Sequence, residues 1–139
     1  MPTDEARNFN WLLSSFVDET AGVTDAMAVS SDGLLIAAST TPGGPGSDEL
    51  CAIIAGSTSL AAAASAAVDG GGVDRVVVAM ARGFLFVSAI ADGSCLGVVA
   101  SRDCDVSSVG YQTTDLVDRA GALLTPALRE ELKQSAAGS

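Results

Sequence analysis

The chain has 139 residues, a length that fits one domain with its own apolar core. Its net charge is −10, which disfavours nucleic acids and anionic membranes as partners, because both are bound through basic patches. It has no histidine, which excludes the usual catalytic triads and most zinc sites. Three cysteines without a CxxC pair, and an acidic start unlike a signal peptide, predict a cytoplasmic protein with reduced thiols.

The first part of the chain predicts a helix followed by a β-hairpin. Apolar residues at helical spacing indicate a helix over about 5–19. Two strands, about 24–31 and 34–39, flank Asp32 and Gly33. An Asp-Gly pair between apolar runs is the strongest short signal of a hairpin. We expect these two residues to be the centres of a type I′ turn, in which both have positive φ.

The middle of the chain predicts a long helix and then three antiparallel strands. A segment rich in proline and glycine, 40–49, leads into a helix over about 48–68 that carries no charge from Leu50 to Val68. Asp92 and Gly93 mark a second Asp-Gly turn. The connections are too short for crossover helices, so neighbouring strands must pair antiparallel. The three expected strands are about 73–81, 84–90 and 95–101.

The last part of the chain predicts two helices. One begins near Asp105, and a short one begins at Pro126 and covers about 126–134, since proline is tolerated only in the first turn of a helix. The order α-β-β-α-β-β-β-α predicts an α+β fold, with a five-stranded, largely antiparallel sheet and helices on both faces. We expect residues 1–139 to form one domain with a core of about 5–125.

The uncharged helix has a side rich in large apolar residues. It is long enough to span a membrane, but its alanine, serine and glycine content and its acidic flank argue against membrane insertion. Residues placed at about 100° intervals around the axis sort into two sides. We expect the side with the large residues to pack on the sheet. These residues are Leu50, Ile53, Ile54, Leu60 and Val68.

The opposite side of this helix carries only alanine, glycine and serine, whereas a surface helix normally carries charges there. Either another helix of the same chain or the same helix of a second copy covers it. We favour the second copy, because the other helices are needed on the far face of the sheet. The strand 73–81 has no charge or proline after Arg75 to protect an edge, which also favours a homodimer. The expected interface residues are Ala52, Ala55, Gly56, Ser59, Ala62, Ala63, Ala66, Val76 and Val78.

No motif predicts catalysis. The glycine-rich segment 40–49 precedes a helix, as phosphate-binding loops do. However, it lacks the Gly-Lys-Ser/Thr ending of a Walker loop and leads into the carboxylates of Asp48 and Glu49. We therefore expect no enzymatic activity, no cofactor and no metal site. An arginine finger at Arg82 is an alternative, although an arginine at an exposed turn is more often simply solvated.

Three parts of the chain carry a family resemblance. They are the stretch AGVTDAMAVSSDGLLIAAS (21–39), the stretch GFLFVSAIADGSCLGVVAS (83–101) and the alanine-rich helix between them. Together with the element order, they resemble the Roadblock dynein-light-chain superfamily, whose fold is of the Roadblock/longin, profilin-like type. The chain is most similar to bacterial MglB-like members, in the actinobacterial form encoded beside a sensor-kinase-like ATPase and a small GTPase. The resemblance covers about residues 5–125.

The resemblance implies a homodimer with paired second helices and one continuous sheet. It also implies a platform for a Ras-like GTPase, whose hydrolysis of nucleotide is stimulated by reorganising the GTPase rather than by an arginine finger. The sensor-kinase-like ATPase is a further partner that the resemblance implies. The residues alone leave open an alternative, a small-ligand-sensing module of profilin-like or PAS-like architecture, which needs an internal pocket with converging polar groups. The GTPase-contact positions that the resemblance implies are Cys51, Ile54, Thr58 and Ser65.

Overall fold

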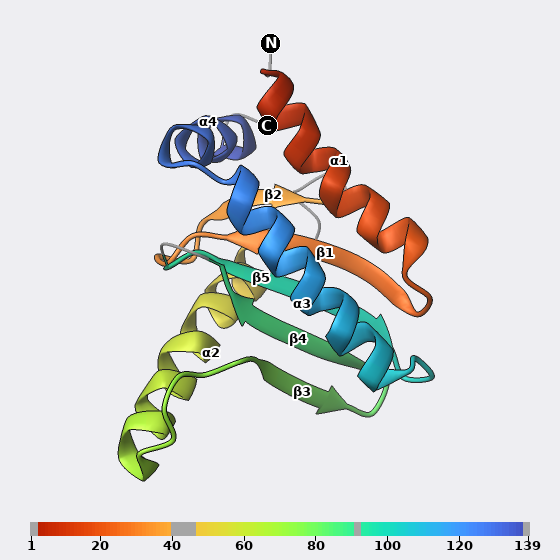
Figure 1. The fold of residues 1–139 in the computed structure, drawn as a ribbon, viewed down its shortest axis with the longest axis vertical. Coiled ribbons are helices and arrows are strands. Elements are labelled where there is room, and N and C mark those ends of the chain that lie inside the picture. The colour runs from red at the N-terminus through yellow and green to blue at the C-terminus, as the bar shows by residue number, and fades with distance from the viewer. Residues whose placement is uncertain (1–2, 40–46, 91–92, 138–139) are drawn as a thin grey trace.

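The computed structural model describes residues 3–39, 47–90 and 93–137, and its elements follow the predicted order (Figure 1). One antiparallel sheet carries three helices on one face and a single long helix on the other. The elements are α1 (Asp4–Glu19), β1 (Val23–Val29), β2 (Leu35–Ala38), α2 (Ser47–Val68), β3 (Val76–Met80), β4 (Gly83–Ala89), β5 (Cys95–Ser101), α3 (Val106–Leu123) and α4 (Pro126–Ala137).

The sheet has the strand order β2-β1-β5-β4-β3, and every neighbouring pair is antiparallel. The predicted five-stranded α+β architecture is therefore confirmed. β2 and β3 are the two edges, and β5 runs through the centre, where Gly97 pairs with Met27 on one side and Val87 on the other. β3 is shorter than the predicted 73–81, and α4 extends beyond the predicted 126–134.

Each face of the sheet has its own core. The larger core lies under α1, α3 and α4 and includes the fully buried Phe9, Leu13 and Phe86. The smaller core lies under α2 and is built on Val29, Val87 and other apolar residues of the strands. α2 crosses β1, β5, β4 and β3 near one end of these strands (Figure 1). A single helix on this face leaves the sheet less covered there than on the opposite face.

The hairpin between β1 and β2 forms as predicted, but its turn differs. The Gly33 backbone N–H donates to the Ser30 carbonyl (3.0 Å), and the Ser30 N–H donates to the Leu34 carbonyl (2.8 Å). Gly33 has φ +85°, whereas Asp69 is the one non-glycine residue with positive φ in the described part of the chain. The type I′ prediction for Asp32 is therefore wrong. The loop has three residues, and only its last position needs a left-handed backbone.

The second Asp-Gly turn is only partly within the described residues. Gly93 has φ +90°, a backbone conformation that favours glycine. Asp92 lies outside the described residues.

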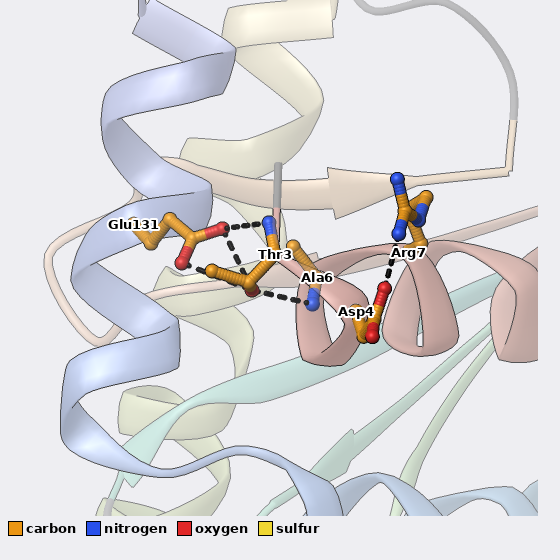
Figure 2. Close-up of polar contacts among 5 residues, drawn as sticks. All are labelled: Thr3, Asp4, Ala6, Arg7 and Glu131. Carbon is orange, nitrogen blue, oxygen red and sulfur yellow. Dashed lines mark hydrogen bonds and ion pairs between the residues drawn. The ribbon is translucent and has the colours of Figure 1, made fainter. Parts of the chain in front are cut away.

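The C-terminal helix is tied to the start of the first helix. The Thr3 backbone N–H and hydroxyl both donate to the Glu131 carboxylate at 3.1 Å, and the Thr3 hydroxyl also accepts from the Ala6 N–H, which caps α1 (Figure 2). Leu128 and Leu132 on α4 are buried in the larger core. α4 is therefore a packed third helix of this layer.

Candidate functional site

α2 rests on the sheet through small and medium side chains. Cys51, Ile54 and Ala55 are buried, and Thr58 is half-buried. Gly97 leaves room for the Ile54 side chain, because a Cβ on Gly97 would overlap Ile54 Cδ1 and lie 3.2 Å from its Cγ1. We call this space the socket. The glycine brings the helix axis close to β5 and fixes which side of α2 faces the strands.

This rotation of α2 differs from the prediction. Ile53, Leu60 and Val68, which we expected against the sheet, are 50%, 75% and 77% exposed. Ile54 alone of the large set is fully buried, and Leu50 is partly buried. The physical reason is that the socket at Gly97 admits Ile54, and small residues on either side then allow close contact.

Exposed apolar residues also lie on β3, on the same face of the sheet as α2. Val78 and Met80 on β3 are 38% and 44% exposed. By the alternation of side chains along a strand, both lie on the side of Val76, which packs in the core under α2. We call the exposed set Ile53, Leu60, Val68, Val78 and Met80 the α2–β3 surface.

The α2–β3 surface is unusual because it lacks charge. From Leu50 to Val68 no residue of α2 is ionisable except the buried Cys51, and β3 contains no charged residue and no proline. β3 is also a sheet edge, whose outer backbone groups have no strand partner among the described residues. An uncharged apolar face beside an open edge is typical of a protein interface.

A groove of about 480 Å³ separates the second half of α2 from β3 and β4. Thr58, Ala62 and Ser65 line it on the helix side, and Val76 and Val87 on the strand side. The Thr58 hydroxyl donates to the Ala55 carbonyl (2.8 Å), and the Ser65 hydroxyl donates to the Gly71 carbonyl. These hydroxyls are satisfied within the helix and its following loop, and the groove is partly open to solvent.

The structure separates the predicted interface residues into two groups. Ala55 is buried against the sheet, so its assignment to a surface between two copies is wrong. Val76 is partly buried and Val78 exposed. Exposed on α2 are Ala52, Gly56, Ser59, Ala62, Ala63 and Ala66. Ile53, Leu60 and Val68 were not predicted for this surface, because periodicity assigned the large apolar residues of α2 to the core. Met80 of β3 was not predicted either.

The predicted GTPase-contact positions also divide. Cys51 and Ile54 lie on the side of α2 that packs on the sheet, where both are buried. A partner cannot reach them in this structure, so these two assignments are wrong. Thr58 and Ser65 are partly exposed and line the groove. Their placement leaves them as candidate contacts.

Two groups near the start of α2 have shifted acidities. Burial, with a smaller effect of the Asp48 carboxylate, raises the pKa of the Cys51 thiol, so this thiol stays protonated and unreactive. On the β1–β2 turn, a hydrogen bond from the Ser30 hydroxyl lowers the pKa of Asp32. The turn adjoins α2, since a Cβ on Gly33 would lie 3.4 Å from the Ala52 Cα.

Neither shifted group belongs to a cluster of metal-ligand type in the described part of the chain. Among residues 3–39, 47–90 and 93–137, no three His, Cys, Asp or Glu side chains gather as metal ligands would. Arg82 is exposed at the turn between β3 and β4. By length and composition alone α2 could cross a membrane, but its first half is packed on the sheet through Cys51 and Ile54.

Comparison with known proteins agrees with this architecture. A Roadblock/LC7 domain from Streptomyces avermitilis is 34% identical, with a TM-score of 0.73 over 79% of this chain and 92% of its own. The gliding protein MglB from Thermus thermophilus is 16% identical, with a TM-score of 0.77 over 88% of this chain and 93% of its own. Profilin IA from Acanthamoeba castellanii is 16% identical, with a TM-score of 0.55 over 82% of this chain and 97% of its own, so the fold is also profilin-like.

A comparison with curated protein sequences found no match. The family model for the Roadblock/LC7 domain matches residues 9–100, which include most of α1, α2 and nearly all of the five-stranded sheet. The α2–β3 surface therefore lies entirely within the matched residues, and the chain belongs to the Roadblock/LC7 domain family.

Proposed function

We propose that this chain is a non-enzymatic homodimer that binds a Ras-like small GTPase and modulates its nucleotide cycle. The observation that carries the proposal is the α2–β3 surface, an uncharged apolar face beside an open sheet edge. Burying a fully exposed Leu or Ile side chain contributes about 1.5–3 kcal/mol, so pairing the surface with itself supplies a driving force for association.

The proposed dimer is isologous, with the same surface on both copies. α2 packs against α2 of the partner, and β3 pairs with β3 of the partner so that one sheet runs through both copies. Gly56 supports this arrangement, because a Cβ there would meet no atom of another described element within 4 Å. The small exposed residues of α2 allow two helices to approach to about 8 Å.

Regulation of a GTPase is the function that fits a platform of this family. Membership in the Roadblock/LC7 family and the fold shared with MglB support this partner class. Activation proceeds, in our proposal, by reorganising the GTPase and without an arginine finger from Arg82. Thr58 and Ser65 are proposed contacts, a sensor-kinase-like ATPase is a proposed further partner, and the cytoplasm is the proposed location.

The small-ligand-sensing alternative has less support. A sensor requires an enclosed pocket in which several polar groups converge on the ligand. The 480 Å³ groove along α2 lies open, and the hydroxyls of Thr58 and Ser65 already bond to backbone carbonyls. An open groove with satisfied hydroxyls fits a docking surface better than a ligand pocket.

Capture of a GTPase tests the proposed partner class. The protein is immobilised and offered a Ras-like small GTPase, loaded with GDP or with a non-hydrolysable GTP analogue. We expect saturable binding of one nucleotide state over the other, followed by a changed rate of hydrolysis or exchange. No binding in either nucleotide state would exclude this GTPase as a partner. It would not affect the proposal of a dimer.

A further inference from the structure

α1 and α3 lie on the sheet face opposite α2 (Figure 1). A second groove, of about 370 Å³, lies between these two helices. Its floor is apolar, because Leu12, Phe16 and Leu116 line it and are buried. We call it the α1–α3 groove. It is separated from the α2–β3 surface by the sheet, so an occupant here would not compete with self-association.

The rim of the α1–α3 groove contains Trp11, the only tryptophan of the chain. Its side chain is 63% exposed. A large aromatic ring left in solvent beside an apolar floor is the residue type that most often anchors a binding partner. The face of an indole ring also attracts guanidinium and ammonium groups. The groove therefore offers an aromatic platform for a cation.

The charges of the groove favour a cation as well. Glu19, Asp115 and Arg119 are its charged lining residues. Arg119 already pairs with Asp115 at 3.7 Å, whereas no cation pairs with Glu19 within the described part of the chain. Glu19 is moreover the last residue of α1, and the last turn of this helix contains no basic residue. The negative end of the helix dipole adds to its carboxylate, which makes this end of the groove favourable for a positive group.

We propose that the α1–α3 groove binds an arginine-bearing segment of a partner protein. One guanidinium stacks on Trp11, a second pairs with Glu19, and an apolar side chain between them contacts the floor. Trp11 and Glu19 are eight positions apart on one helix, which corresponds to about 12 Å along its axis. An extended segment covers that distance in about four residues, so the arginines are spaced by about four positions.

Trp11 itself reports binding, because its fluorescence is the only tryptophan signal of the chain. The probe is a synthetic peptide with two arginines four positions apart and leucine between them, titrated into the full chain. We expect a saturable change in fluorescence that weakens as salt is added. A peptide with glutamine in place of arginine, and one with the two arginines adjacent, should bind at least about tenfold more weakly, a difference of about 1.4 kcal/mol.

Matched variants distinguish binding in the α1–α3 groove from general attraction of the peptide by the net charge of −10. Glu19→Gln should weaken binding about tenfold, whereas Glu5→Gln, the same change at the exposed start of the same helix, should have no effect. Trp11→Ala, followed by anisotropy of a labelled peptide, should weaken binding by a similar factor, and Trp11→Phe should restore part of it. Equal weakening by Glu5→Gln and Glu19→Gln, or unchanged binding by Trp11→Ala, would overturn the proposal.

Discussion

Ile54 of α2 occupies the space that a side chain on Gly97 of β5 would fill. A Cβ on Gly97 would overlap Ile54 Cδ1 and lie 3.2 Å from its Cγ1. This one pair sets how α2 is rotated on the sheet. With Ile54 in the socket, Ile53 and Leu60 face outward and form the α2–β3 surface. The surface proposed to bind a second copy thus depends on a glycine on a different element.

Gly97→Ala should lower the free energy of unfolding by about 1–3 kcal/mol, because overpacking forces Ile54 or the helix to move. Urea denaturation measures the change. Gly72→Ala is the matched control, since its added Cβ would meet no atom within 4 Å. Adding Ile54→Val to Gly97→Ala should recover part of the loss, as expected for two residues in contact. Equal stability of the two glycine variants would contradict the socket.

Thr113→Val should raise the free energy of unfolding by about 1 kcal/mol. The Thr113 Oγ1 is buried without a hydrogen-bond partner in the described part of the chain, and removing an unsatisfied hydroxyl relieves its desolvation cost. Thr114→Val is the control with opposite sign, because the Thr114 hydroxyl donates to the Gly110 carbonyl (3.1 Å) and accepts from Arg75 (2.7 Å). Thermal unfolding of both variants gives the comparison. Destabilisation by Thr113→Val would show that its hydroxyl is satisfied.

The acidity of Asp32 should depend on Ser30. The hydrogen bond from the Ser30 hydroxyl lowers the pKa of Asp32, so Ser30→Ala should move this pKa back toward its ordinary value. A carboxyl whose pKa is lower in the folded state stabilises the fold above its unfolded pKa, and the contribution is lost as pH falls through the folded value. NMR titration of the Asp32 carboxyl measures the shift. An identical titration in wild type and Ser30→Ala would refute this cause.

Much of the fold is predictable from sequence because its signals are local. The Asp-Gly pair at 32–33 located the first hairpin, and the short connections after Val76 required antiparallel pairing. The detail of the turn was not predictable, since Ser30 forms two backbone hydrogen bonds that lengthen the loop to three residues. Such competition between two hairpin geometries is not visible in the dipeptide alone.

The rotation of α2 was not predictable because its cause is non-local. Periodicity placed Ile53 and Ile54 together toward the sheet, but the socket at Gly97 admits only Ile54. The same error assigned Ala55 to a dimer interface, although it is buried. A helix with apolar residues on every side has no charged stripe to indicate which side faces the core.

Sedimentation equilibrium of the full chain at micromolar concentration tests the central claim most directly. Leu60 and Tyr111 are both 75% exposed, on opposite faces of the sheet, and both are replaced by glutamate. Our account predicts a dimer for the wild type and for Tyr111→Glu, and a folded monomer for Leu60→Glu, because a charge on the exposed side of α2 cannot be buried unpaired in the interface. A monomeric wild type, or a dimer that Leu60→Glu leaves intact, would contradict it.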